Sequence, residues 1–455
     1  RSRRKAITSL ALHSAGESES ESIRRRPQRA FLMAVHVRGE RSVFDTDSSL
    51  EELRRLAETA GLEVVGQDRQ NVEQVQPATY MGAGKVAEVR ERCSELGAEV
   101  VIFDDELSPA QLRTLERELG LSILDRTALI LDIFALHART REGALQVALA
   151  QYAYRMPRLT RQWTHLSRQA VGGVGLRGPG ETQLESDRRE IGRRMAQLRR
   201  ELEQVRQLRG QRRRQRRRQG LPTVAIVGYT NAGKSTLLNR LTDAGVLVQD
   251  QLFATLDPTT RRLDLPGGKQ VLFTDTVGFI QKLPTQLVAA FRATLEEVLE
   301  ADVLVHVIDI SDPLVLDKDS AVLQVLREIG ADAKPMILAM NKIDLVDPEA
   351  LAARESTRFL QREGPVSRLS DEYERVVLLS AEQGVGIEDL LAEIEAVLAE
   401  NMLPFDVVLP YSAGDILSSW RERGVVDSVE YGPDGVHVVG RLPRWAAGIL
   451  DGVLE

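Results

Sequence analysis

Cysteine is almost absent from this sequence. The 455 residues include one, Cys93, which rules out an internal disulfide and a metal site with several cysteine ligands. This usage fits a reducing compartment, so we expect a cytoplasmic protein. Long apolar runs are missing too, because the longest candidate, 128–136, is much shorter than a membrane span and contains Asp132. We therefore expect no stable membrane insertion.

Charge is abundant but unevenly distributed. Charged residues make up 28% of the chain and hydrophobic residues 43%, which is typical of a soluble globular protein with buried cores. Behind the formal net charge of −7, arginine is concentrated in the middle of the chain and Asp and Glu dominate the second half. A chain of this length predicts about two to four domains.

The pattern of elements predicts a multi-domain α/β protein. Residues 1–30 combine Arg with Ser-Glu repeats and few apolar residues, which indicates a disordered tail. Strands alternate with helices over 31–135, which predicts a small α/β domain with a mainly parallel sheet. We expect a helical hairpin linker over 136–220, a nucleotide-binding domain over 221–400 and a small α/β domain over 401–455.

Two local features of the first domain allow alternatives. Ser48 or Ser49 should cap a helix over 48–61 that ends at Gly61. The glycine-rich sequence T-Y-M-G-A-G-K at 79–85 is either a second nucleotide loop or a turn that opens a helix. The remaining elements expected here are strands 31–37, 62–65 and 99–103 and helices 85–96 and 109–119.

The linker should form two antiparallel helices. A helix over 139–156 has one apolar face, and a later helix has a coiled-coil seam of Ile191, Met195, Leu198, Leu202 and Val205.

The connection between these helices, 159–180, is rich in glycine and contains Trp163 and three arginines. It is either an RNA contact or a flexible tip. The arginine run over 199–218 is either a solvated helix face or a contact with RNA phosphates.

The stretch 223–236 carries the strongest local signal. An apolar β-branched run predicts a buried strand, apolar residues at helical spacing follow, and G-x-x-x-x-G-K-S lies between them. The glycines let backbone N–H groups surround phosphate oxygens at the positive end of the helix. We expect Lys234 to reach the β- and γ-phosphates and Ser235 to hold Mg²⁺. The nucleotide-binding residues of this phosphate loop are Gly228, Tyr229, Thr230, Asn231, Ala232, Gly233, Lys234 and Ser235.

A second motif follows a hydrophobic strand. D-x-x-G places Asp275 to hold Mg²⁺ through water and places the Gly278 N–H to meet the γ-phosphate. Its residues are Asp275, Thr276, Val277 and Gly278. A hydrolase of this kind also needs a threonine that reaches Mg²⁺, for which the residues alone leave open Thr255, Thr259 and Thr260.

A third motif, N-K-x-D, specifies the base. The Asp344 carboxylate can only accept hydrogen bonds, which guanine offers and adenine does not. Because adenine would leave this carboxylate without a donor, the site can favour guanine over adenine by up to about 10⁴–10⁵-fold. The Lys342 stem should pack over the base, and a later S-A loop should meet the guanine carbonyl. The base-binding residues are Asn341, Lys342, Ile343, Asp344, Ser380, Ala381 and Glu382.

These motifs resemble the HflX family of ribosome-associated GTPases. The similar sequences are G-Y-T-N-A-G-K-S, L-F-A-T-L-D-P-T-T-R, D-T-V-G-F, N-K-I-D, S-A and the linker sequence R-G-P-G-E-T-Q-L-E-S-D-R-R at 177–189, and the resemblance extends from about residue 31 to the C-terminus. It implies a translation-factor-class GTPase that binds the large ribosomal subunit and its RNA and splits stalled ribosomes, with the linker loop near the peptidyl-transferase centre. It also links the first domain to ATP-dependent RNA remodelling, although no clean motif here supports that link.

The resemblance carries the Mg²⁺ threonine onto Thr255. The nucleotide-binding residues implied in that segment are Phe253, Ala254, Thr255, Leu256 and Asp257. The predicted catalytic residues are then Lys234, Gly278 and Thr255, and the predicted metal ligands are Ser235 and Thr255.

Two residues modify this prediction. Many regulatory GTPases place Gln after D-x-x-G to orient the attacking water, and this chain has Phe279. We therefore expect slow intrinsic hydrolysis and stimulation by the ribosome. Asn231 resembles an asparagine that binds K⁺ in some phosphate-loop GTPases.

We predict a monomeric GTPase that converts GTP to GDP and phosphate with Mg²⁺, and that does not bind DNA. The alternative is an RNA-binding or ribosome-assembly module in which GTP binding only gates docking. An RNA-modifying GTPase is a weaker hypothesis, because the expected catalytic cysteine context is missing.

Overall fold

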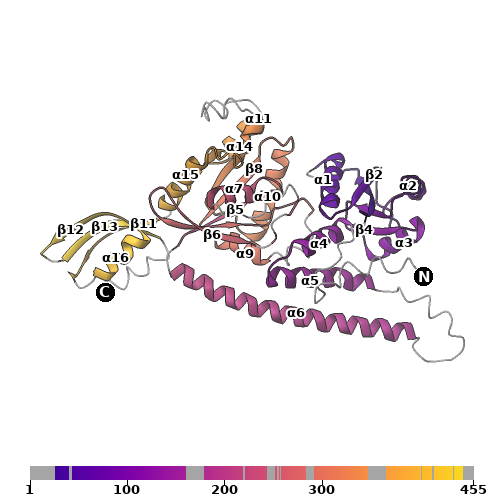
Figure 1. The fold of residues 1–455 in the computed structure, drawn as a ribbon, viewed down its shortest axis with the longest axis horizontal. Helices are drawn as coiled ribbons and strands as arrows, with labels where there is room; N and C mark the ends of the chain where they lie inside the picture. Colours follow the sequence, from indigo (N-terminus) through magenta and orange to yellow (C-terminus); the bar gives the residue numbers. More distant parts are fainter. Residues whose placement is uncertain are drawn as a thin grey trace.

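The structure is a computed structural model. It describes residues 26–39, 44–159, 179–218, 221–242, 252–253, 256, 258–282, 292–346, 365–400, 402–411, 414–433 and 435–443. The tail predicted over 1–30 lies almost wholly outside these residues. Three sheets lie in a row along the molecule, and one long helix runs beneath the first two (Figure 1). We call the three parts the N-terminal, central and C-terminal domains.

The N-terminal domain is a four-stranded sheet in the order β2-β1-β3-β4, with every neighbouring pair parallel. Parallel pairing follows from the alternation of strands and helices, because each crossover returns the chain to the same edge of the sheet. The elements are β1 (Arg29–Val37), α1 (Thr46–Thr59), β2 (Glu63–Val72), α2 (Ala83–Leu96), β3 (Val100–Phe103), α3 (Pro109–Leu119), β4 (Ser122–Asp125) and α4 (Arg126–His137).

The cap predicted for the first helix was wrong. Asp45 is the N-cap of α1, and its carboxylate accepts from the Ser48 N–H at 2.6 Å. The Ser49 hydroxyl donates instead to Asp104 at 2.6 Å, so a tertiary partner takes the group that the local pattern offered as a cap.

At 79–85 the structure favours a turn that opens a helix over a second nucleotide loop. Gly82 is the N-cap of α2, and Gly84 lies inside the helix. The Lys85 ammonium pairs with Asp68 at 2.8 Å and with Glu88 at 3.0 Å. The lysine of a nucleotide loop would instead be directed at a phosphate.

The helical linker packs as the seam predicts. Helices α5 (Arg141–Arg155) and α6 (Pro179–Arg218) lie side by side, joined through the 3₁₀ turn η1 (Met156–Leu159) and a connection mostly outside the described residues (Figure 1). Leu145 of α5 is buried with Leu198 and Leu202 of α6. Met195 is also buried, as the heptad spacing requires.

The central domain holds a six-stranded sheet in the order β10-β9-β8-β5-β7-β6. All pairs are parallel except β6 with β7. The strands are β5 (Thr223–Val227), β6 (Thr259–Asp264), β7 (Gln270–Asp275), β8 (Val303–Asp309), β9 (Met336–Asn341) and β10 (Val376–Leu378). The helices are α7 (Lys234–Thr242), α9 (Arg292–Glu300), α10 (Val315–Ile329), α11 (Ile343–Val346), α14 (Pro365–Glu372) and α15 (Ile387–Glu400). The carboxyl ends of the parallel strands share one edge, where ligands bind in sheets of this type.

The C-terminal domain is an antiparallel sheet in the order β11-β13-β12 with one helix. Its elements are β11 (Met402–Leu409), α16 (Gly414–Arg423), β12 (Val425–Gly432) and β13 (Gly435–Pro443). Trp420 is a core residue, with its ring 4.6 Å from that of Phe405. No described helix is both long enough and apolar enough to cross a membrane.

Candidate nucleotide site

The phosphate loop connects the central strand β5 to α7. Gly228 has φ +149°, and a Cβ there would lie 2.2 Å from the Val307 carbonyl oxygen. Gly233 has φ +95°, and a Cβ there would lie 2.2 Å from the Asn341 side-chain nitrogen. Only glycine fits both positions, which explains the spacing in the sequence.

Lys234 is buried at the start of α7. Its ammonium donates to the Tyr229 carbonyl at 2.6 Å, inside the loop that should receive phosphate. Burial lowers the pKa of Lys234 to about 8, with Asp275 opposing the shift. A phosphate would supply the negative charge that this buried cation lacks, so we expect its affinity for the ammonium to be high.

The two side chains predicted to hold Mg²⁺ face each other. The Ser235 hydroxyl donates to the Asp275 carboxylate at 2.7 Å. Both are hard oxygen donors of the kind that Mg²⁺ prefers, and Mg²⁺ usually takes one or two protein ligands with phosphates and water. This pair therefore fits the ion. Within the described ranges, no group of three or more His, Cys, Asp or Glu side chains could hold a metal.

The D-x-x-G segment lies directly against the phosphate loop. Thr230 N–H donates to the Phe279 carbonyl at 2.8 Å, and Phe279 N–H donates to the Gly228 carbonyl at 3.1 Å. The Thr276 hydroxyl donates to Ile226 O at 2.6 Å, and Val277 is buried. A Cβ at Gly278 would lie 2.9 Å from both Lys234 and Thr230. The backbone at Gly278 thus lies directly beside Lys234 and Thr230 of the phosphate loop.

Asn341 joins the loops predicted to surround the base. Its amide donates to the Ala232 carbonyl at 2.8 Å and accepts from the Ala381 N–H at 2.9 Å. The neighbouring Lys342 has φ +64°, and its ammonium pairs with Asp309 at 2.7 Å. Ile343 is buried, and half-buried Asp344 lies in the first turn of α11.

Arg240, which belongs to none of the sequence motifs, supports the S-A loop. From the last turn of α7 its guanidinium donates to the carbonyls of Ala381 (3.2 Å) and Glu382. Ser380 tightens the same loop, since its carbonyl accepts from the Gly384 N–H at 2.8 Å. One helix thus presents the phosphate loop at its start and holds the base loop near its end. The only signal for this role was a basic residue in the last turn.

The segment before β6 is described in part. Leu256 is buried, and the Phe253 ring lies edge-on to that of Phe134 of α4 at 4.6 Å. Thr260 lies in β6, with its hydroxyl 3.1 Å from that of Thr274, and Thr259 begins the same strand. Ala254, Thr255 and Asp257 lie outside the described residues, so Thr255 stays a prediction.

Backbone strain concentrates around the nucleotide motifs. Among the described non-glycine residues, φ is positive at Tyr80 and at four positions in the central domain: Asn231, Phe253, Lys282 and Lys342. Such conformations persist only where the surroundings hold them, and they cluster at functional sites.

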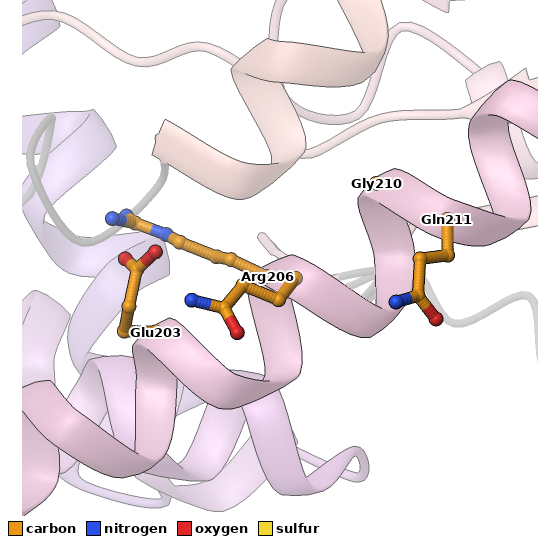
Figure 2. A pocket seen from close by; sticks show the side chains of 5 residues that line it. Glu203, Arg206, Gly210 and Gln211 are labelled. Carbon is orange, nitrogen blue, oxygen red and sulfur yellow. The ribbon is translucent and has the colours of Figure 1, made fainter.

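A separate hollow lies along one side of α6 (Figure 2). It is lined by Glu203, Arg206, Gln207, Gly210 and Gln211. The Arg206 guanidinium and the Glu203 carboxylate point to the same side of the helix. None of these residues belongs to the nucleotide motifs.

Three family models match consecutive parts of the chain. They are described as GTP-binding GTPase N-terminal over residues 47–135, GTP-binding GTPase Middle Region over 137–216 and 50S ribosome-binding GTPase over 223–342. Together they cover the N-terminal domain from α1 onward, the linker, and the part of the central domain from the phosphate loop to the first two residues of N-K-x-D.

Curated relatives match over nearly the whole chain. GTPase HflX of Lacrimispora saccharolytica is 45% identical over 91% of this chain and 94% of its own length, and GTPase HflX of Escherichia coli is 42% identical with the same coverage. Among solved structures, a GTP-binding protein from the archaeon Sulfolobus solfataricus in complex with GDP is 26% identical, covers 81% of this chain and 98% of its own, and has a TM-score of 0.41. From the family models and the near-complete match to the curated relatives, we conclude that the chain belongs to the HflX family of GTPases.

Proposed function

We propose that this GTPase binds the large ribosomal subunit through rRNA, splits or recycles ribosomes, and hydrolyses GTP in a Mg²⁺-dependent reaction that the ribosome stimulates. The observation that carries the nucleotide chemistry is the convergence of Lys234, the Ser235–Asp275 pair and Gly278 at one edge of the sheet. The 50S ribosome-binding description of the matching family supports the choice of partner. Such a partner would place the protein in the cytoplasm.

The residues divide the work of phosphoryl transfer. Lys234 would leave the Tyr229 carbonyl for the β- and γ-phosphates, and the Gly278 N–H would meet the γ-phosphate. Ser235 and Thr255 would hold Mg²⁺ directly, and Asp275 would hold it through water. The ion would neutralise charge on the phosphate oxygens.

Among the described residues, the position directly after Gly278 carries no side chain that could orient water. Phe279 is buried and has no hydrogen-bonding group in its side chain. Its backbone N–H donates to the Gly228 carbonyl, and its backbone carbonyl accepts from the Thr230 N–H. A group supplied in trans can raise the rate of such a reaction by about 10³–10⁵-fold. We therefore propose slow turnover alone and fast turnover on the ribosome.

The linker supplies a rigid support for an RNA contact. Its two helices share a buried apolar seam, and Arg209 near the end of α6 pairs with buried Glu142 of α5 at 2.8 Å. The arginine-rich end, 212–218, continues the same helix towards the central domain. We propose that the connection 159–180 binds rRNA. Contacts between its arginines and RNA phosphates would make this binding weaken as the salt concentration rises.

Cosedimentation with separated ribosomal subunits tests this function. The proposal expects pelleting with the large subunit in GTP, weaker pelleting in GDP, and less binding as salt rises. Equal pelleting with both subunits in every nucleotide state would refute it.

A splitting assay separates the primary proposal from the alternative of GTP-gated docking. Intact ribosomes are mixed with the protein and GTP, GDP or a non-hydrolysable GTP analogue, and the free subunits are counted. The primary proposal expects subunits to appear with GTP and the analogue, with hydrolysis serving release. Docking without any free subunits would favour the RNA-binding or assembly module.

A further inference from the structure

The N-terminal domain holds the phosphate loop and the segment after Gly278 in one closed ring of polar contacts. Tyr229 of the phosphate loop donates its hydroxyl proton to Glu52 of α1. The same hydroxyl accepts from the Gln281 N–H at 2.8 Å. Tyr229 therefore joins two parts of the nucleotide site to a helix 177 residues away in sequence.

The other half of the ring consists of charged groups. The Arg126 guanidinium pairs with Glu52 and, at 2.7 Å, with Asp104. Asp104 also receives the Lys282 ammonium at 2.6 Å, and Lys282 reaches Asp105 at 2.5 Å. Lys282 follows Gln281 in the chain, so the ring closes. Its members are Tyr229, Glu52, Arg126, Asp104, Lys282 and Gln281.

A cross-link inside the ring secures the same segment. The Gln281 side chain donates to the Ser49 hydroxyl at 2.9 Å, and Ser49 donates to Asp104 at 2.6 Å. The backbone of Gln281 is thus bonded to Tyr229, which is anchored by Glu52. Its side chain is bonded to Ser49, which is anchored by Asp104. Lys282 has φ +51°, a conformation that its ion pairs help to maintain.

Most of the ring is shielded from solvent, and Lys282 is its exposed member, with 35% of its side chain accessible. Tyr229 is 4% exposed, Asp104 2% and Arg126 1%. Burial raises the pKa of Tyr229, so the phenol keeps the proton that it donates to Glu52. The carboxylates of Asp104 and Asp105 raise the pKa of Lys282 against the opposing effect of burial, so it stays charged. Polar groups buried in this way act as a unit, because each loses water that only its neighbours replace.

We infer that Tyr229 and Glu52 are positioning residues for GTP hydrolysis, which hold the Gly278 backbone at the γ-phosphate. Gly278 lies three residues before Gln281, and Phe279 between them is bonded to Gly228 and Thr230. Loss of the Tyr229 hydroxyl removes the contact that fixes the Gln281 backbone and loosens the segment that carries Gly278. GDP has no γ-phosphate and does not use this contact. The ring therefore favours GTP over GDP, and three of its six residues, Glu52, Asp104 and Arg126, belong to the N-terminal domain.

This inference rests on the proposed contact between Gly278 and the γ-phosphate, and Tyr229→Phe in the full chain tests it. We expect the affinity for a non-hydrolysable GTP analogue to fall about tenfold, which is the effect of one lost hydrogen bond to a charged group. Turnover at saturating GTP should fall with it, and the affinity for GDP should change less than about twofold. The matched control is Tyr411→Phe, which removes a hydroxyl donated to Gly432 O at 2.7 Å in the C-terminal domain.

Glu52→Leu and the double variant with Tyr229→Phe keep the test decisive. If the hydroxyl acts through Glu52, Glu52→Leu, which offers the hydroxyl no acceptor, should reproduce the selective loss for GTP. The double variant should then lose no more than Glu52→Leu alone. A parallel loss of GDP and GTP affinity would show a merely structural role and overturn the inference, as would wild-type values in both single variants. If the wild type itself did not prefer the GTP analogue to GDP, the proposed Gly278 contact would fail instead.

Discussion

Arg126→Met should weaken the attachment of the N-terminal domain to the nucleotide site. The Arg126 guanidinium is 1% exposed and pairs with both Glu52 and Asp104. Removing one partner from a buried ion pair costs about 3–5 kcal/mol, because it leaves an uncompensated buried charge. Asp104 keeps Lys282 at 2.6 Å and the Ser49 hydroxyl, so Glu52 bears most of the loss. We therefore expect the lower end of that range, about 3 kcal/mol.

Hydrogen exchange measures this loss locally, which suits a multi-domain chain that need not unfold in one step. Amides of α1 and of the segment 279–282 should lose about 100-fold in protection, which corresponds to about 3 kcal/mol. The control is Arg117→Met, because Arg117 is exposed and its pair with Glu118 is worth at most about 1 kcal/mol. If both variants exchanged alike, the buried charges would not hold the two domains together, and the reasoning would be wrong.

Three further changes test the base contacts and the packing of the central domain. Asp344→Asn should shift the nucleotide preference from guanosine towards xanthosine, since the amide can donate where the carboxylate only accepted; unchanged preference in competition binding would contradict the assigned base contact. Arg240→Ala should weaken GDP and the GTP analogue equally, by about tenfold, because the lost bonds support the base loop and not the phosphates; a loss confined to GTP would count against this role. Burial raises the pKa of Asp319 from 3.8 to about 6, so its protonated form stabilises the fold and wild-type stability should fall as pH rises through that window. The amide oxygen that Asp319→Asn introduces would still accept from the Tyr373 hydroxyl. The free energy of unfolding of this variant should exceed that of the wild type by an amount that grows between those pH values to about 3 kcal/mol and then levels off. A difference in urea unfolding that did not depend on pH would rule this out.

Much of the nucleotide site could be predicted because its residues follow buried strands. The phosphate loop follows β5, and D-x-x-G and N-K-x-D begin at the last residues of β7 and β9. Parallel strands bring their carboxyl ends to one edge. The order of motifs in the chain therefore fixes their meeting in space. Helix α3 was also predicted with its observed bounds, because Pro109 begins it and Gly120 ends it.

The contacts between domains could not be predicted, because they depend on pairs of surfaces and leave no local pattern. Glu52 occupies an ordinary position in an amphipathic helix, and its partner Tyr229 is an ordinary residue of the phosphate loop. The misplaced cap of α1 has the same cause, since Ser49 is used by Asp104 across the fold. Arg240 looked like a charge that complements a helix end, and its two carbonyl partners lie about 140 residues further along the chain.

The single helix α6 has a mechanical consequence. Its 40 residues form a rod about 60 Å long, at 1.5 Å per residue. Four residues separate its end from the first residue of β5, the strand that leads into the phosphate loop. A tilt of about 5° at that end would displace the opposite end by about 5 Å, given this length. A change of sub-ångström size around a phosphate could thus become a movement as large as an amino-acid side chain at the far end of the linker.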